Sequence, residues 1–232
     1  MTLNSLSGLP DVNSSSMAKR IYGNVSDEEK RLCARILAHF IGTPNTSYGA
    51  DIGEKIKLTR IDVYPRAPNV PETHDPSYVT MDKSDSSLQG TVTSRSQASL
   101  DLEARTVCEI TVTKEMCNIH GVLHGGCAMY MMDPCSVCAL VALGVAIGTD
   151  GSGVSQTMFT QWHRPAPEGA ELSIIATTVA TNGYIRSSRC EIRDRKTNVL
   201  YVSCIHSIVN VASKWGKGQG HNSTNGPVRS KL

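Results

Sequence analysis

The feature that most constrains the fold is an apolar run near the middle of the chain that contains a single acidic residue. Residues 120–133 read HGVLHGGCAMYMMD, and the chain continues after Asp133 as PCSVCALVALGVAIG. The stretch from Leu123 to about Leu143 therefore predicts one long, mostly apolar helix. A charged side chain is rarely buried unless it is paired or functional, so Asp133 is the first candidate for a functional residue.

Composition and charge exclude several classes of protein. The chain has 232 residues, of which 40% are hydrophobic and 19% charged, and its formal net charge is +2. No dense run of Lys and Arg is present, so we expect no nucleic-acid partner. The first residues lack the pattern of a secretory signal, and the apolar run 138–148 is too short to span a bilayer. We therefore expect a soluble intracellular protein without a membrane span.

The eight cysteines do not form a spacing typical of a disulfide framework. Cys135 and Cys138 form a C-x-x-C, which we interpret as two small buried helix residues rather than a redox pair. A zinc site needs four ligands, and neither a second C-x-x-C nor an H-x-x-x-H completes the set. The sequence therefore predicts neither a metal nor a cofactor.

The remaining elements follow from periodicity. Residues 26–42 predict a helix, with Ser26 and Glu29 as a capping box. Alternating strand-like segments are 55–65, 103–116, 153–165, 171–181, 184–194 and 199–211, and Asn182-Gly183 is typical of a hairpin turn. The order is strands, one central helix, then an antiparallel meander. It predicts an α+β fold in which a curved antiparallel sheet wraps around the helix.

The predicted domain boundaries follow composition. Residues 1–24 are rich in Ser and Asn and are expected to be a disordered leader. One domain then covers 25–212, interrupted by a Pro-, Ser- and Asp-rich insertion at 66–99. Residues 213–232 are expected to be a flexible tail.

Two glycines mark the start of the central helix. Gly125 and Gly126 let a ligand approach the backbone, and the first N–H groups of a helix favour negative charge. Such groups can stabilise a carbonyl oxygen that gains charge, as in an oxyanion hole. Asp133 lies eight residues further along, or about 12 Å at 1.5 Å per residue. One carbonyl cannot contact both, so joint catalysis predicts a symmetric dimer with two antiparallel helices.

Helical geometry also separates the faces of this helix. At about 100° per residue, Gly126, Met129, Val137 and Leu140 fall on the side of Asp133. Cys135 falls nearly opposite and is expected in the core. Pro134 removes one helical hydrogen bond and is expected to kink or distort the helix.

The spacing H-G-G-x6-D, preceded by Asn118 and five residues, resembles the hotdog-fold acyl-CoA thioesterases of the phenylacetyl-CoA and 4-hydroxybenzoyl-CoA type. It is closest to the small eukaryotic thioesterase-superfamily enzymes. The segments GVS at 153–155 and RPAPEGAEL at 164–172 also match landmarks of that family. The resemblance extends from about Lys55 to Val211 outside the insertion.

The resemblance implies roles for individual residues. Asn118 and the Gly125 N–H would polarise the thioester carbonyl, and His124 would shape that loop. Asp133 would act as general base or nucleophile from the facing subunit, and Ser155 would position the water. Pro134 and the insertion depart from the family pattern.

The resemblance implies a homodimer or dimer of dimers that hydrolyses an acyl-CoA, with coenzyme A as part of the substrate. Arg164, Arg186 and Arg189 are candidates for contact with its phosphates. His206 is interpreted as an ordinary sheet residue. The alternatives are a hotdog hydratase or dehydratase and a non-catalytic acyl-CoA-binding protein.

The sequence ends in Ser230-Lys231-Leu232. Such a tripeptide at a free C-terminus is an address read by a peroxisomal import receptor. We therefore expect that receptor as a partner, a peroxisomal location and a place in lipid metabolism.

Overall fold

The computed structural model describes residues 19–43, 46–66, 102–181 and 183–210. Its centre is one six-stranded antiparallel sheet with the strand order β1-β2-β4-β5-β6-β3. The strands are β1 (Lys57–Pro65), β2 (Leu102–Thr111), β3 (Val154–Trp162), β4 (Glu171–Ala180), β5 (Ile185–Asp194) and β6 (Leu200–Val209). Their alternating burial places one face of the sheet against a helix layer, which confirms the predicted hotdog architecture.

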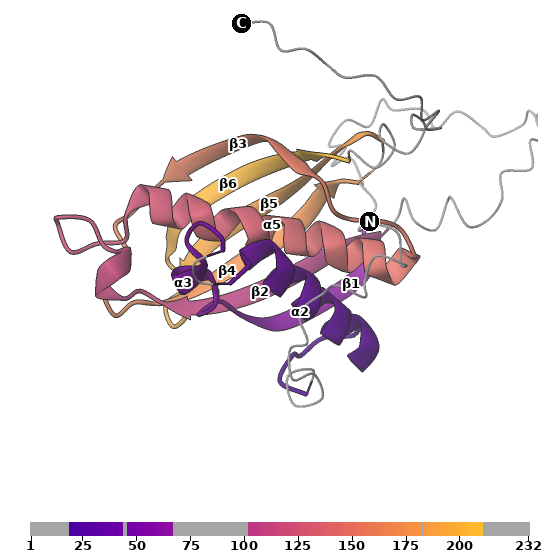
Figure 1. Cartoon of the computed structure of the whole chain (residues 1–232), viewed down its shortest axis with the longest axis horizontal. Helices are drawn as coiled ribbons and strands as arrows, with labels where there is room; N and C mark the ends of the chain where they lie inside the picture. The colour runs from indigo at the N-terminus through magenta and orange to yellow at the C-terminus, as the bar shows by residue number, and fades with distance from the viewer. Residues whose placement is uncertain (1–18, 44–45, 67–101, 182, 211–232) are drawn as a thin grey trace, which may run out of the picture.

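The helix layer is dominated by α5 (Gly125–Ile147), which runs across one face of the sheet (Figure 1). The core lies between this helix and the strands. Fully buried members include Met131, Cys135, Leu172, Ile174 and Ile192. Burial of Cys135 agrees with the predicted orientation of the helix, whose apolar face packs against the sheet.

Pro134 lies inside α5 without ending it, because the helix continues to Ile147. The helix is longer than the predicted 123–143 and ends at Gly148, whose φ of 72° is favourable for glycine. By length and composition alone, α5 qualifies as a membrane-spanning helix. Most of it is buried inside the protein, which is the behaviour of a core helix.

A second helix, α2 (Asp27–Ile41), packs beside α5. Its predicted capping box is confirmed. Ser26 Oγ accepts a hydrogen bond from Glu29 N at 3.3 Å, and Glu29 Oε2 accepts one from Ser26 N at 2.7 Å. A short helix that the sequence pattern does not predict, α3 (Ala50–Gly53), follows before β1.

The two outer strands differ in what covers them. Tyr22 forms a parallel bridge with Arg60 of β1, and Ile21 beside it is buried. The predicted disordered leader, residues 1–24, is therefore wrong for residues 19–24. Among the described residues, β3 has no partner beyond β6, and most of its side chains are exposed.

Two further expectations need correction or fall outside the structure. The strand expected at 103–116 ends at Thr111, and Lys114–Met116 form a 3-10 turn, η2, that leads toward α5. Asn182 and most of the insertion and the tail lie outside the described residues. The rest of the division into domains stays a prediction.

Candidate active site

Asp133 is the one charged residue of α5. Its side chain retains 51% exposure, while Met132 and Pro134 on either side of it are buried. The Ser155 hydroxyl donates a hydrogen bond to Asp133 Oδ1 at 3.0 Å. Ser155 lies on β3, where a bulge follows it before Thr157. The structure thus brings together two of the predicted site residues. The Asp133 carboxylate is held by the Ser155 hydroxyl and is partly exposed to solvent.

His206 lies directly behind this carboxylate, on β6. Its side chain is completely buried, and Nε2 lies 3.6 Å from Asp133 Oδ1. Nδ1 lies 2.6 Å from Ser136 Oγ, which is also 2.8 Å from the Asp133 carbonyl oxygen. Burial lowers the pKa of His206 below its ordinary value, and the charge of Asp133 opposes that shift.

His206 was interpreted as an ordinary sheet residue, and the structure instead places it beside Asp133. The sequence did contain a signal for this residue. Strand alternation places position 206 on the same face as Val202, Cys204 and Ile208, which predicts a buried histidine. A histidine on a buried face needs polar partners. Only the three-dimensional structure shows that one such partner is Asp133.

The first turn of α5 carries the second group of candidates. His124 is the N-cap residue, and its Nδ1 accepts a hydrogen bond from Gly126 N at 3.0 Å. The Gly125 N–H has no acceptor within the part of the chain that the structure describes, as is typical of a first-turn amide. The structure thus assigns His124 a capping role, which leaves the Gly125 N–H available to a ligand.

Asn118 and Gly125 line the same pocket, which has a volume of about 410 Å³. Asn118 Oδ1 accepts a hydrogen bond from His120 N at 2.9 Å, which fixes the side chain in the loop before α5. The Trp162 indole lies close to Gly125, since a Cβ placed there would be 3.3 Å from Trp162 Nε1. The pocket therefore combines hydrogen-bond donors from Asn118 and Gly125 with apolar side chains such as Trp162.

Asp133 and Ser155 do not line this pocket. The candidate site of a single chain thus consists of two separate groups. The donor group comprises Asn118 and Gly125, and the acid group comprises Asp133, Ser155 and His206. Helix geometry puts the two groups about 12 Å apart along α5.

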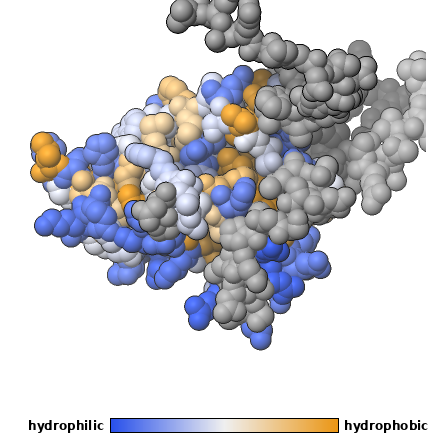
Figure 2. Space-filling model, in the orientation of Figure 1, coloured by the Kyte–Doolittle hydropathy of each residue, from blue (hydrophilic) through white to orange (hydrophobic). Residues whose placement is uncertain are grey.

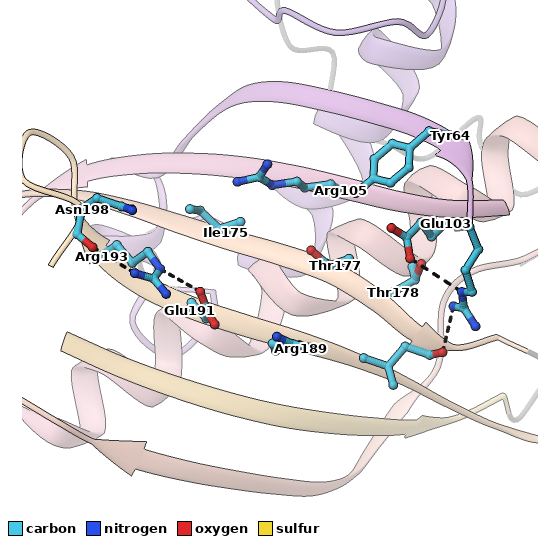
Figure 3. A pocket seen from close by; sticks show the side chains of 12 residues that line it. Tyr64, Glu103, Arg105, Ile175, Thr177, Thr178, Arg189, Glu191, Arg193 and Asn198 are labelled. Carbon is cyan, nitrogen blue, oxygen red and sulfur yellow. Dashed lines mark hydrogen bonds and ion pairs between the residues drawn. The ribbon is translucent and has the colours of Figure 1, made fainter. Parts of the chain in front are cut away.

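The three candidate arginines lie in three different places. Arg164 lines the pocket of the donor group. Arg186 is partly buried and donates to the Asp150 carbonyl oxygen, and burial lowers its pKa. Arg189 lies on the opposite face of the sheet, in an open groove of about 760 Å³ (Figure 3). Arg164 alone of the three therefore lies with the donor group.

The groove in Figure 3 is lined by four arginines and two glutamates. Arg193 pairs with Glu191 at 2.7 Å, and Arg66 lies 3.6 Å from Glu103. The remaining two arginines are Arg105 and Arg189. No helix of the described chain covers this face.

All eight cysteines are free thiols. Cys135 and Cys138 are buried, as expected for helix residues in the core. Across the described ranges, no three His, Cys, Asp or Glu side chains gather as metal ligands.

A family model of the thioesterase superfamily matches residues 120–201. Among solved structures, zebrafish thioesterase superfamily member 2 is 16% identical and covers 75% of this chain and 93% of its own, with a TM-score of 0.48. Mouse thioesterase superfamily member 2 is 19% identical and covers 75% and 95%, with a TM-score of 0.46. No curated protein matches the chain.

A third solved structure is that of a hypothetical thioesterase protein with coenzyme A from Streptococcus pneumoniae. It is 17% identical and covers 45% of this chain and 79% of its own, with a TM-score of 0.41. The family match includes the donor group's Gly125 together with Asp133 and Ser155, and the sheet and helix have the order of a hotdog fold. The family match thus agrees with the resemblance predicted from the sequence, over residues 120–201.

Proposed function

We propose that this protein hydrolyses an acyl-CoA thioester to a carboxylic acid and coenzyme A. The observation that carries the proposal is the placement of Asp133 in a segment of the thioesterase superfamily. Its carboxylate is half exposed, accepts a hydrogen bond from Ser155, and interrupts the otherwise buried stretch 131–144 of α5. A base of this kind is what thioester hydrolysis needs to activate water.

The two groups divide the chemistry between them. The thioester carbonyl oxygen would accept hydrogen bonds from the Gly125 N–H and the Asn118 side-chain amide. Asp133 would take a proton from the attacking water while Ser155 holds that water. The tetrahedral intermediate then collapses, the C–S bond breaks, and the sulfur of coenzyme A receives the proton. Alternatively, the carboxylate attacks the carbonyl first, the C–S bond breaks, and coenzyme A leaves as a thiolate that later takes a proton. Water then hydrolyses the mixed anhydride, which releases the acid and restores the Asp133 carboxylate.

Both groups act on one carbonyl only when a second copy of the chain supplies one of them. A two-fold dimer with antiparallel α5 helices would place Asp133 of one copy beside Gly125 of the other, twice. The two polar groups then form a pair of complete sites. A dimer is therefore part of the proposed function.

The edge of the sheet at β3 supports this assembly. Its exposed apolar side chains include Val154 at 57%, Phe159 at 67% and Trp162 at 53%. A bare, apolar edge strand is a template for pairing with another chain. The face in Figure 2 also shows apolar atoms exposed among polar ones, on the side of the molecule that carries α5. Pairing of two β3 strands would bring the α5 helices side by side.

Release of coenzyme A thiol from a panel of acyl-CoAs tests the proposal. Wild type and Asp133→Asn are compared, with Asp51→Asn on α3 as a matched control that removes an exposed carboxylate elsewhere. We expect Asp133→Asn to lower kcat by about 100-fold or more, the size typical of a lost general base. Equal activity of Asp133→Asn and wild type, or no thiol release by wild type, would contradict the proposal.

We further propose that the protein is taken to peroxisomes through Ser230-Lys231-Leu232, which lie outside the described residues. Acyl-CoA substrates fit that compartment. Expression of the chain with an N-terminal fluorescent protein tests this, with Lys231→Glu as the comparison. Punctate fluorescence should become diffuse in the variant, and unchanged puncta would overturn the assignment.

A further inference from the structure

Trp162 places an indole N–H beside the donor group. It is the last residue of β3, and a Cβ placed on Gly125 would lie 3.3 Å from its Nε1, 3.4 Å from Cε2 and 3.5 Å from Cζ2. These three atoms form the edge of the indole that carries the N–H, so this edge faces the first turn of α5. Any side chain at position 125 would press on the indole, and the glycine therefore permits the approach.

The indole N–H has no hydrogen-bond acceptor in the described part of the chain. An indole nitrogen can only donate, and a tryptophan usually finds an acceptor for it. Trp162 lines the same pocket as Asn118 and Gly125, and it remains 53% exposed. A molecule that enters the pocket can therefore supply the acceptor.

The indole N–H and the Gly125 N–H are close enough to share one acceptor. Two covalent bonds separate Gly125 N from the Cβ position, so Trp162 Nε1 and Gly125 N are at most about 6 Å apart. An oxygen that accepts at ordinary N–H···O lengths can bridge two donors up to about 6 Å apart. Asn118 adds its side-chain NH2 group to the same pocket, since its Oδ1 already accepts from His120 N.

We propose that Trp162 is a further catalytic residue, whose indole N–H donates to the thioester carbonyl oxygen together with the Gly125 N–H. This inference rests on the proposed function. When water adds to the carbonyl carbon, the π electrons of the C=O bond move to the oxygen, which gains negative charge. The indole keeps its proton throughout, and the charge returns to the C=O bond when the C–S bond breaks. Because the hydrogen bond strengthens as the charge develops, it lowers the barrier more than it tightens substrate binding.

The proposed dimer would bring this donor to the acid group of the second copy. Gly125 and Asp133 lie four residues on either side of Met129 in α5. Their neighbours, Trp162 and Ser155, lie at opposite ends of β3. A two-fold axis beside Met129 therefore exchanges the two pairs, and would bring the indole of one chain to the carboxylate of the other. The carbonyl oxygen would then meet the donors while the water activated by Asp133 attacks the carbon.

NMR of the indole N–H tests this contact without relying on turnover. Trp215, the second tryptophan, lies outside the described residues, and Trp215→Phe leaves one indole signal in the ¹⁵N-labelled full-length protein. The probe is a ketone analogue of the best acyl-CoA substrate, in which CH2 replaces the thioester sulfur, so that the carbonyl is kept and hydrolysis is blocked. The control is the alkyl-CoA thioether, which lacks that carbonyl. We expect a downfield shift of the Trp162 N–H signal that is clearly larger with the ketone. Equal shifts with both compounds at saturation would overturn the proposal.

Removal of the N–H alone tests its part in catalysis. Benzothienylalanine has a sulfur in place of the indole N–H and keeps the shape of tryptophan, so we would incorporate it at position 162 of the Trp215→Phe protein. We expect kcat to fall about 10-fold, the size of one lost neutral hydrogen bond, while KM changes little. Trp162→Phe should lose at least as much. Trp215→Phe is the matched control and should keep the wild-type kcat.

The outcomes separate this inference from the proposed function. A wild-type kcat in the benzothienylalanine protein would refute the role of Trp162, while a loss in Asp133→Asn in the same assay would leave the proposed function standing. A raised KM with an unchanged kcat would also refute it, because Trp162 would then only form a wall of the pocket. Sedimentation of the same samples distinguishes a lost donor from a lost dimer, since Trp162 lies on β3.

Discussion

The first turn and the middle of α5 belong to one helix but present opposite chemistry. The first turn offers donors, because Gly125 keeps an N–H free and Asn118 lies in the same pocket. The middle offers an acceptor, because Asp133 carries a carboxylate between Ser155 and His206. Neither region contains both halves of an acyl-transfer site. This difference is the basis for our proposal that one chain carries two incomplete sites, which a two-fold axis would complete.

The two edges of the sheet explain how such an axis can arise. At β1 the Asn24 side chain binds the backbone of Val63, donating at 2.7 Å and accepting at 2.8 Å, so that edge is partly occupied. At β3 no comparable contact exists among the described residues. Self-association is therefore expected at β3, next to Ser155.

The largest effect is expected from a charge placed at the β3 edge. Phe159→Arg should weaken the dimer, because a cation would be buried against its symmetry mate. Activity should fall by about 100-fold at low protein concentration and recover as the concentration rises. Sedimentation and thiol release measured on the same samples check this. Tyr22→Arg, at the covered edge and 70% exposed, is the matched control. A monomeric Phe159→Arg variant with full activity would contradict the proposal that the site needs two copies of the chain.

The next largest effect on activity is expected from a change in the donor group alone. Asn118→Ala removes one candidate donor to the carbonyl oxygen, and loss of such a donor typically costs about 100-fold in kcat. The dimer should stay intact, because Asn118 lies in the loop before α5 and not at β3. Steady-state kinetics together with sedimentation distinguish this result from loss of assembly. Unchanged kcat would remove Asn118 from the donor half.

A smaller effect is expected from the arginine that shares the donor pocket. Arg164→Gln should raise KM for acyl-CoA about 10-fold with little change in kcat, because a charge contact to a remote phosphate is made in ground and transition states alike. Arg189→Gln, on the opposite face of the sheet, should leave KM unchanged. A larger effect of Arg189→Gln would place the coenzyme in the groove of Figure 3.

The smallest expected effect is on the stability of the fold and concerns His206 of the acid group. The pKa of His206 is lowered by burial, so below about pH 6.5 the unfolded chain binds a proton that the folded chain does not. Stability should therefore fall as the pH drops below that value. Tm measured at pH 7.5 and 5.5 should show a smaller loss in His206→Gln than in wild type. An equal loss in both proteins would contradict this assignment.

Much of this arrangement follows from local sequence. The apolar run and its glycines predict α5, alternation predicts the strands, and Ser26 with Glu29 predicts the start of α2, because these signals depend on neighbours in the chain. Asp133 stands out for the same reason, as one charge in an apolar helix. Ser155 is predicted as a site residue only through the family resemblance, and its hydrogen bond to Asp133 is visible only in the structure.

What the sequence did not predict depends on contacts between distant residues. His206 looked like an ordinary strand residue, since its role is visible only when β6 packs against the middle of α5. Burial of Ile21 required residues 19–24 to lie along β1, which composition does not reveal. The sequence also could not show which candidate arginine lies near the donor group. The strand register places Arg189 on the outer face of the sheet, away from that group.

Each complete site is proposed to combine the donor group of one chain with the acid group of another. Mixing two inactive proteins, Asn118→Ala and Asp133→Asn, tests this proposal most directly after subunit exchange. A random mixture of dimers should recover roughly a quarter of wild-type activity, since half are heterodimers and each of these has one intact site of two. A mixture no more active than its separate components, with heterodimers present, would contradict the claim.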